Sequence, residues 1–306
     1  MNRWILYQRE RFPLAAHGPL VAAFSASAVC FSSLVRGHVA MPSWRALLVA
    51  FVTSLLFFLQ LRIADEFKDY EDDARFRPYR PVPRGLVTLR ELAWIGVAAA
   101  AVQLALALWL DPSMVWLLAL AWIYLALMTR EFFAPEWLKA RPIVYLASHM
   151  VIMPLVDLYA TACDWWAAGL RQPPPGLYWF LVVSYLNGVV IEIGRKTRVP
   201  ADEERGVETY SALWGTHGAA RAWLAAVLLT AFAAWRASAR IGTEAPTLFL
   251  LATLAAACAV VAWRVTRGLT RRGGKPIEVM SGVWTLLMYL SLGGAPLAVL
   301  LWRAAR

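Results

Sequence analysis

Long apolar stretches separated by short polar connections run along almost the whole chain. Nine stretches are long enough, or nearly so, to cross the ~30 Å hydrocarbon core of a bilayer as helices. They cover approximately residues 16–35, 44–64, 91–110, 113–129, 142–163, 177–194, 218–235, 244–263 and 279–302. The pattern predicts an all-α polytopic membrane protein, a bundle of nine transmembrane helices forming one domain over residues 1–306. Residues 1–15, with arginines among aromatic and aliphatic residues, are expected to form an interfacial N-terminal segment.

The distribution of charge predicts how the helices are oriented. One side of the membrane holds the N-terminus and four connections, and it collects about 22 of the 30 Lys and Arg residues. Those connections are residues 65–90, 130–141, 195–217 and 264–278. The positive-inside rule makes this side cytoplasmic, in a membrane of the bacterial inner or plasma type. The net charge of +10 is therefore mostly topological and indicates contact with membrane lipid or an anionic substrate. We expect no nucleic-acid partner, and no feature of the sequence indicates an obligatory protein partner.

An acidic run, DEFKDYEDD at 65–73, stands where the second apolar stretch leaves the membrane. Asp65, Asp69 and Asp73 are spaced four residues apart, so one helix would stack their carboxylates on one face, with Glu66 beside them. Stacked carboxylates repel one another unless a cation lies among them. Mg²⁺ carrying a diphosphate supplies that charge, because Mg²⁺ binds a few carboxylates together with phosphate oxygens. The alternative interpretation is a solvated, charged helix end.

The acidic run and its sequel resemble the UbiA superfamily of intramembrane prenyltransferases. Its first motif, N-D-x-x-D-x-x-x-D, is matched here by D-E-x-x-D-x-x-x-D, and its R-P-x-P-x-G stretch by RPVPRG at 80–85. The resemblance implies nine transmembrane helices and a cytoplasmic-side active site that needs Mg²⁺. It also implies that the metal ligands of the first motif are Asp65, Glu66, Asp69 and Asp73.

The second polar segment, RKTRVPADEERGVETYSALWGTH at 195–217, departs from the second family motif. That motif is D-x-x-x-D, followed four residues later by Gly. Anchored on Gly206, its second aspartate is Asp202, while its first falls on Arg198. The resemblance therefore implies a weaker second metal position at Asp202 and a stronger cationic clamp on the diphosphate. The clamp residues are Arg195, Lys196 and Arg198.

Four further polar residues near the ends of apolar stretches are candidates for the same site. Arg75 follows the acidic run, and Arg130 closes the fourth stretch, where the family often has a basic residue. Both are expected to bind diphosphate. Glu192 and Asn187 lie on the sixth stretch and are expected to shape the deeper part of the pocket, although Asn187 equally suits a structural hydrogen bond.

Two ionisable residues lie inside the fifth stretch. His149 is about two turns from its cytoplasmic end and suits either a base in contact with an acceptor or a satisfied structural histidine. Asp157 is an unusual intramembrane carboxylate near the outer end, too far from the cytoplasmic motifs for a primary catalytic role.

Three functions are compatible with these residues. The first is a Mg²⁺-dependent enzyme that ionises a prenyl diphosphate and transfers the prenyl group to an aromatic or other lipophilic acceptor, releasing diphosphate. The second is a membrane-bound terpene cyclase that converts a substrate such as farnesyl or geranylgeranyl diphosphate into a cyclic terpene, with the cation shielded from water and cushioned by aromatic rings. The third is a transporter or lipid-binding protein, which calls for broken helices or charged pairs near the bilayer midplane. Because charge is concentrated at one face, we expect an enzyme, with transfer favoured over cyclisation.

Overall fold

The computed structural model describes residues 2–204, 206–270 and 273–304, and every element in this part of the chain is helical. Residues 1, 205, 271–272 and 305–306, which belong to the predicted N-terminal segment, second polar segment, basic connection and C-terminus, lie outside it. The α-helices are α1 (Arg3–Arg11), α2 (Leu14–Val35), α3 (Trp44–Lys68), α4 (Tyr70–Phe76), α5 (Leu89–Leu110), α6 (Met114–Thr129), α7 (Pro135–Lys139), α8 (Pro142–Met150), α9 (Ile152–Trp165), α10 (Leu177–Arg195), α11 (Tyr210–Ser238), α12 (Glu244–Thr266), α13 (Lys275–Leu292) and α14 (Gly294–Ala304). Two 3₁₀ turns, η1 (Glu131–Phe133) and η2 (Pro200–Asp202), lie in the connections.

Local sequence explains where several helices begin. Ser43 and Thr209 cap α3 and α11, each accepting a hydrogen bond from the backbone N–H three residues on, at 3.1 and 3.0 Å. Thr88 and Glu91 form a reciprocal capping box at the start of α5. Pro142 stands at the first position of α8, where its missing N–H costs nothing.

All nine predicted stretches are helical, but only eight helical segments of the described residues are long and apolar enough to cross a membrane. The stretch at 113–129 forms α6, which has 16 residues and falls short of the usual span. The all-α, polytopic fold is thus confirmed, whereas the predicted count of nine transmembrane helices is not.

Two of the eight spans are divided into separate helices, and a third, α11, is kinked at Gly215, which has φ 69° and ψ 160°. The fifth predicted stretch is divided into α8 and α9 at Val151, and the last is divided into α13 and α14 at Gly293. A Cβ at Gly293 would collide with the backbone of Ser27 on α2. Glycine therefore lets α13 approach α2 closely at the break.

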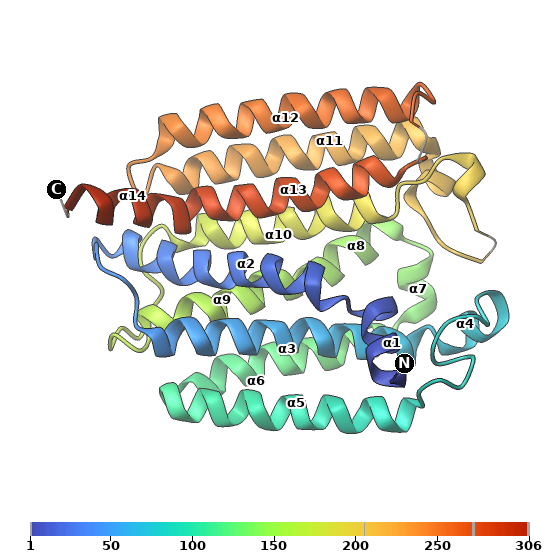
Figure 1. The fold of residues 1–306 in the computed structure, drawn as a ribbon, viewed down its shortest axis with the longest axis horizontal. Coiled ribbons are helices and arrows are strands. Elements are labelled where there is room, and N and C mark those ends of the chain that lie inside the picture. The colour runs from blue at the N-terminus through green and yellow to red at the C-terminus, as the bar shows by residue number, and fades with distance from the viewer. Residues whose placement is uncertain (1, 205, 271–272, 305–306) are drawn as a thin grey trace.

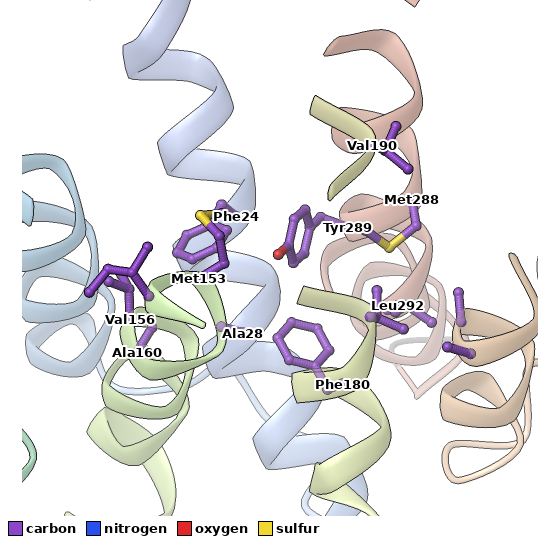
Figure 2. Packing of buried hydrophobic residues seen from close by; sticks show 14 of the residues in the cluster. Phe24, Ala28, Met153, Val156, Ala160, Phe180, Val190, Met288, Tyr289 and Leu292 are labelled. Atoms are coloured by element: carbon purple, nitrogen blue, oxygen red, sulfur yellow. The ribbon is translucent and has the colours of Figure 1, made fainter. Parts of the chain in front are cut away.

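The bundle core is packed with aromatic and small residues (Figure 2). Phe24 and Phe180 pack edge-on against Tyr289, with ring centroids 5.1 and 5.7 Å from it. Ala28 of α2 and Ala160 of α9 are fully buried where these two helices pack together. Because lipid tails are as apolar as the helices, close packing of this kind stabilises the bundle inside a membrane.

The polar connections of interest gather at one end of the bundle (Figure 1). Helices α1, α4 and α7 and the connection from α10 to α11 lie there, and the described C-terminal helix α14 lies at the opposite end. We call this the motif end. Side chains more than 100 positions apart in sequence meet there.

Candidate active site

The first acidic segment bends in its middle. Helix α3 ends at Lys68, Asp69 has φ −92° and ψ 6°, and α4 begins at Tyr70. The backbone hydrogen bonds continue across the bend, from Asp69 N–H to Asp65 O (2.9 Å) and from Asp73 N–H to Asp69 O (2.8 Å). The run is therefore not one regular helix, because the backbone changes conformation at Asp69, although Asp69 still interacts electrostatically with both Asp65 and Asp73.

Asp73 is buried between two arginines. Its carboxylate forms ion pairs with Arg77 at 2.7 Å and with Arg80 at 2.6 Å, and only 2% of its side chain is exposed. Two guanidinium groups offset the cost of burying this charge. Asp73 therefore anchors the connection after α4, and both of its oxygens already have cationic partners.

Glu66 is also committed to an arginine. It is buried and forms an ion pair with Arg11 of α1. A second pair, Arg84 to Glu10 at 2.9 Å, joins the same N-terminal helix to the connection after α4. The predicted interfacial segment is thus attached to the site by charge.

Of the four acids predicted to bind metal, Asp65 and Asp69 lack the short arginine pairs that Glu66 and Asp73 form. Asp65 is 39% exposed, and its nearest ion pair is Arg62 at 3.4 Å. Burial, and after it the negative charge of Asp65, raises the pKa of Asp69. A divalent cation would relieve that repulsion.

The acids at the motif end suit Mg²⁺ bound together with phosphate oxygens. Two carboxylates plus substrate phosphates are a common Mg²⁺ environment, and Asp65 and Asp69 supply the two carboxylates. No group of three or more potential metal ligands occurs among the described residues. The residues therefore fit a metal that arrives with a diphosphate better than a metal held by protein alone.

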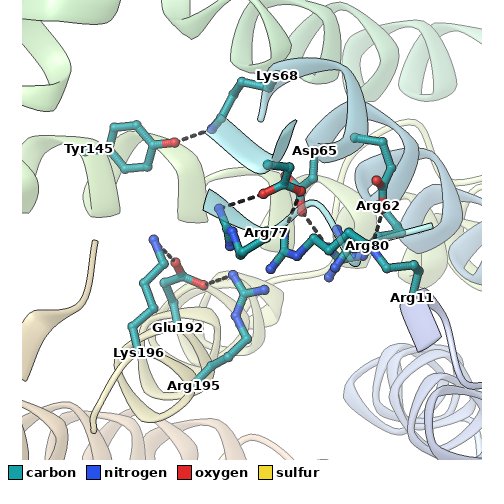
Figure 3. Close-up of polar contacts among 12 residues, drawn as sticks. Arg11, Arg62, Asp65, Lys68, Arg77, Arg80, Tyr145, Glu192, Arg195 and Lys196 are labelled. Atoms are coloured by element: carbon teal, nitrogen blue, oxygen red, sulfur yellow. Dashed lines mark hydrogen bonds and ion pairs between the residues drawn. The ribbon is translucent and has the colours of Figure 1, made fainter. Parts of the chain in front are cut away.

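The end of α10 presents two cations held by one acid (Figure 3). Glu192 pairs with Arg195 at 2.7 Å and with Lys196 at 3.0 Å. Arg195 is 45% exposed and also interacts electrostatically with Asp65. The structure thus brings this end of α10 next to the first acidic segment, as the sequence predicted for the two motifs.

The rest of the second segment lies around an open pocket of about 460 Å³. At this pocket, Arg198 donates hydrogen bonds to the Glu204 carboxylate at 2.9 Å and to the Asp202 carbonyl oxygen at 3.1 Å. Asp202 accepts from the Gly274 N–H at 3.3 Å, just before α13. No acid of the first segment lines this pocket. Arg195 also lines this pocket, so Asp202 and Arg198 lie around the same opening as Arg195, with Asp202 engaged by the start of α13.

Two other predicted residues lie apart from these contacts. Arg75 is exposed and rests 5.1 Å from the Phe76 ring centroid, and Arg130 is exposed where α6 ends. By contrast, Asn187 is fully buried and accepts from Thr285 at 3.2 Å. Asp157 is fully buried and accepts from the Tyr289 hydroxyl at 2.9 Å, far from the motif end.

Sequence reasoning missed the partners of the acids. Arg77 and Arg80 follow Asp73 by four and seven residues, a spacing that places them on its face if the helix continues. Lys68 forms an ion pair with Glu131 at 3.2 Å and a hydrogen bond with Tyr145. These contacts join α3 to η1 and α8, and no sequence pattern pointed to them.

Comparison with known proteins assigns the chain to a protein family. A profile of the UbiA prenyltransferase family matches residues 26–277. The chain belongs to the UbiA prenyltransferase family. It is an integral membrane protein of that family, whose members act on prenyl diphosphates. No curated protein matches it.

Solved structures of UbiA homologues share the fold. The apo UbiA homolog from Aeropyrum pernix K1 has a TM-score of 0.68 and 15% identity, over 93% of this chain and 98% of that one. A UbiA homolog from Archaeoglobus fulgidus bound to GPP and Mg²⁺ has a TM-score of 0.58 and 13% identity, over 95% and 99%. The same homolog bound to DMAPP and Mg²⁺ has a TM-score of 0.55 and 13% identity, over 94% and 98%. At these identities the likeness concerns the fold.

Proposed function

We propose that this protein is a Mg²⁺-dependent prenyltransferase that ionises a prenyl diphosphate and transfers the prenyl group to a lipophilic acceptor, releasing diphosphate. The observation that carries the proposal is the convergence at the motif end. Asp65, which like Asp69 lacks a short arginine pair, interacts electrostatically with the half-exposed Arg195. Acids that suit a metal and cations that suit a diphosphate thus share one end of an apolar bundle.

In this proposal Asp65 and Asp69 would hold Mg²⁺, which when bound neutralises the charge that develops on the departing diphosphate. Arg195 and Lys196 exchange part of their pairing with Glu192 for phosphate oxygens, and Glu192 keeps both side chains oriented. Asp73 and Glu66 act as anchors that hold Arg77, Arg80 and Arg11 around the acidic bend. We assign Arg198 and Asp202 to the rim of the site and give Arg75 and Arg130 no direct contact with substrate.

The apolar bundle suits the prenyl tail. The charged diphosphate would lie at the polar motif end of the protein, and the hydrocarbon tail would lie between the apolar helices. Two neighbouring folds were solved with DMAPP or GPP and Mg²⁺, which supports the same substrate class here. The excess of Lys and Arg at the motif end supports a cytoplasmic location for it and for the N-terminus.

A terpene cyclase remains the second candidate because of the core. Phe24, Phe180 and Tyr289 form an aromatic cluster inside the bundle, and aromatic faces stabilise carbocations (Figure 2). In that reaction a double bond of the substrate captures the cation, and no acceptor is needed.

The test uses purified protein in detergent or lipid with Mg²⁺ and C10, C15 and C20 prenyl diphosphates, first without an acceptor. Diphosphate release and extracted hydrocarbons are followed together. Intact substrate, or slow hydrolysis to the linear alcohol, is the result expected of a transferase without its acceptor. Cyclic products would replace transfer with cyclisation, and failure of all three substrates to bind in the presence of Mg²⁺ would overturn both.

A further inference from the structure

A second polar cluster lies beside the acidic bend, between α3, η1 and α8. Lys68 donates to the Tyr145 hydroxyl and forms an ion pair with Glu131 at 3.2 Å (Figure 3 shows Lys68 and Tyr145). The Tyr145 hydroxyl donates to Glu131 at 3.4 Å. The Tyr145 ring stacks on His149, with centroids 3.9 Å apart. The cluster joins the metal-binding segment to an ionisable side chain inside the bundle.

Two buried atoms of this cluster have no hydrogen-bond partner among the described residues. They are Nε2 of His149 and Oε2 of Glu131. His149 is 7% exposed and Glu131 is 5% exposed, so water does not satisfy them freely. Leaving such buried groups unpaired is unfavourable, because they lose their hydrogen bonds to water without gaining others. Two such groups in side chains that both contact Tyr145 indicate a place for a polar ligand.

The tautomer of His149 follows from its contacts. Its Nδ1 lies 2.9 Å from the carbonyl oxygen of Tyr145, an acceptor, so Nδ1 carries the proton. Nε2 is then an acceptor, as is the carboxylate oxygen of Glu131. A ligand that satisfies both must supply donors. Glu131 is already paired with Lys68, so a neutral hydroxyl needs no further counter-charge here, whereas a resident protonated amine would.

The backbone around Glu131 is strained in a way that supports a functional role. Glu131, Phe132 and Phe133 have φ of 48°, 52° and 60°, a left-handed turn of three consecutive residues with side chains. This conformation is sterically unfavourable for residues with a Cβ, and such residues cluster at functional sites. The turn directs Glu131 toward Lys68 and packs the Phe132 ring edge-on against His149, with centroids 5.9 Å apart.

We propose that His149 and Glu131 form the acceptor subsite, and that the acceptor is a lipophilic molecule with a hydroxyl group. This inference rests on the proposed transfer function. A lone pair of the acceptor oxygen forms the bond to the allylic carbon, and the bond from that carbon to diphosphate breaks with its electron pair leaving on diphosphate. The hydroxyl proton passes to Nε2 of His149 and then to solvent. Glu131 Oε2 accepts a hydrogen bond from a second hydroxyl or a water and stabilises the imidazolium.

The test supplies hydroxyl amphiphiles with a prenyl diphosphate and Mg²⁺. The probes are dodecanol and 4-dodecylphenol, and their methyl ethers are the matched controls without a donor. We expect the wild-type protein to prenylate at least one hydroxyl probe and neither ether. We expect His149→Phe and Glu131→Gln to lower transfer about 100-fold. Binding of geranyl thiodiphosphate, a poorly ionising analogue, should change by less than about two-fold in both variants.

Matched variants separate this role from general damage. Glu136→Gln changes an exposed acid on α7, and His38→Phe changes an exposed histidine at the opposite end of the bundle. Both should transfer at the wild-type rate. His149→Gln supplies a smaller polar change if His149→Phe does not fold, and it should also lose transfer while binding the thiodiphosphate.

Three results would overturn the subsite. One is unchanged transfer in both the His149 and Glu131 variants, and another is prenylation of the methyl ethers. The third is no reaction with any hydroxyl probe by wild-type protein that binds the thiodiphosphate with Mg²⁺, which leaves the proposed diphosphate site standing. If the thiodiphosphate does not bind, the proposed function fails and the subsite fails with it.

Discussion

The two polar segments at the motif end hold their charges in opposite ways. In the first, Asp73 and Glu66 are each buried against arginine, while Asp65 and Asp69 are left to repel one another. In the second, a single acid, Glu192, holds two cations at the end of α10. The first segment thus has carboxylates to offer and the second has cations to offer. The metal of a Mg²⁺-diphosphate would pair with the carboxylates of the first segment, and the diphosphate would pair with the cations at the end of α10.

The departure of the second segment from the family motif fits this contrast between acids and cations. Arg198 stands where an aspartate is usual, and acids of the second segment are engaged within it or at the start of α13, Glu204 by Arg198, Glu203 by Thr209 and Asp202 by Gly274. The proposed site is therefore asymmetric, with the metal near α3 and the cationic clamp near α10.

The largest expected effect comes from removing the acids assigned to Mg²⁺. Asp65→Ala and Asp69→Ala should each lower kcat/KM about 10³-fold, because metal stabilisation of the departing diphosphate is lost. Glu71→Ala, an exposed acid on α4, is the matched control and should have little effect. The measurement is diphosphate release at saturating Mg²⁺. Wild-type rates in both aspartate variants would remove the first segment from the metal site.

The next effect is on stability and concerns Asp73. Asp73→Asn leaves the buried guanidinium groups of Arg77 and Arg80 without their counter-charge, and should lower the free energy of unfolding by about 3–5 kcal/mol. Asp72→Asn changes an exposed neighbour and should be nearly neutral. Denaturant unfolding in detergent compares the two variants. Equal stability would contradict the anchoring role.

A smaller effect is expected from the second segment. Arg195→Gln and Lys196→Gln should each raise the KM for prenyl diphosphate about 10- to 100-fold, since each removes a charged hydrogen-bond donor to phosphate. Arg75→Gln, at an exposed position, should change KM by less than about two-fold. If Arg75→Gln has the larger effect, the clamp is wrongly placed.

The smallest effect tests the repulsion between Asp65 and Asp69. Because burial and Asp65 raise the pKa of Asp69, its ionised form is disfavoured in the folded state. The contribution of Asp69 to the free energy of unfolding should therefore fall as pH rises from below the ordinary carboxyl pKa to above the raised one, and the difference between wild type and Asp69→Asn isolates that contribution. Asp69→Asn should lack this fall and show a slightly higher Tm at neutral pH without Mg²⁺. Thermal unfolding across that range measures both curves, and a lower Tm for Asp69→Asn at neutral pH would contradict the repulsion.

The fold class followed from the pattern of apolar stretches, and that pattern also predicted at which end of the bundle the two polar motifs lie. Apolar stretches of about 20 residues must form helices in lipid, because no water is available there for unpaired backbone groups. The positions of Asp65, Asp69, Arg195 and Lys196 also followed from sequence, since polar residues at the ends of such stretches have to lie near the membrane surface.

Only the tertiary structure decided which charges are free and which are paired. Glu66 and Asp73 belong to the same acidic run as Asp65 and Asp69, yet arginines from α1 and from the connection after α4 neutralise them. The contacts of Lys68 with Glu131 and Tyr145 likewise join residues more than 60 positions apart. Periodicity within one segment carries no information about partners brought from elsewhere by helix packing. The physical reason is that an ion pair depends on distance in space, whereas a motif records only spacing along the chain.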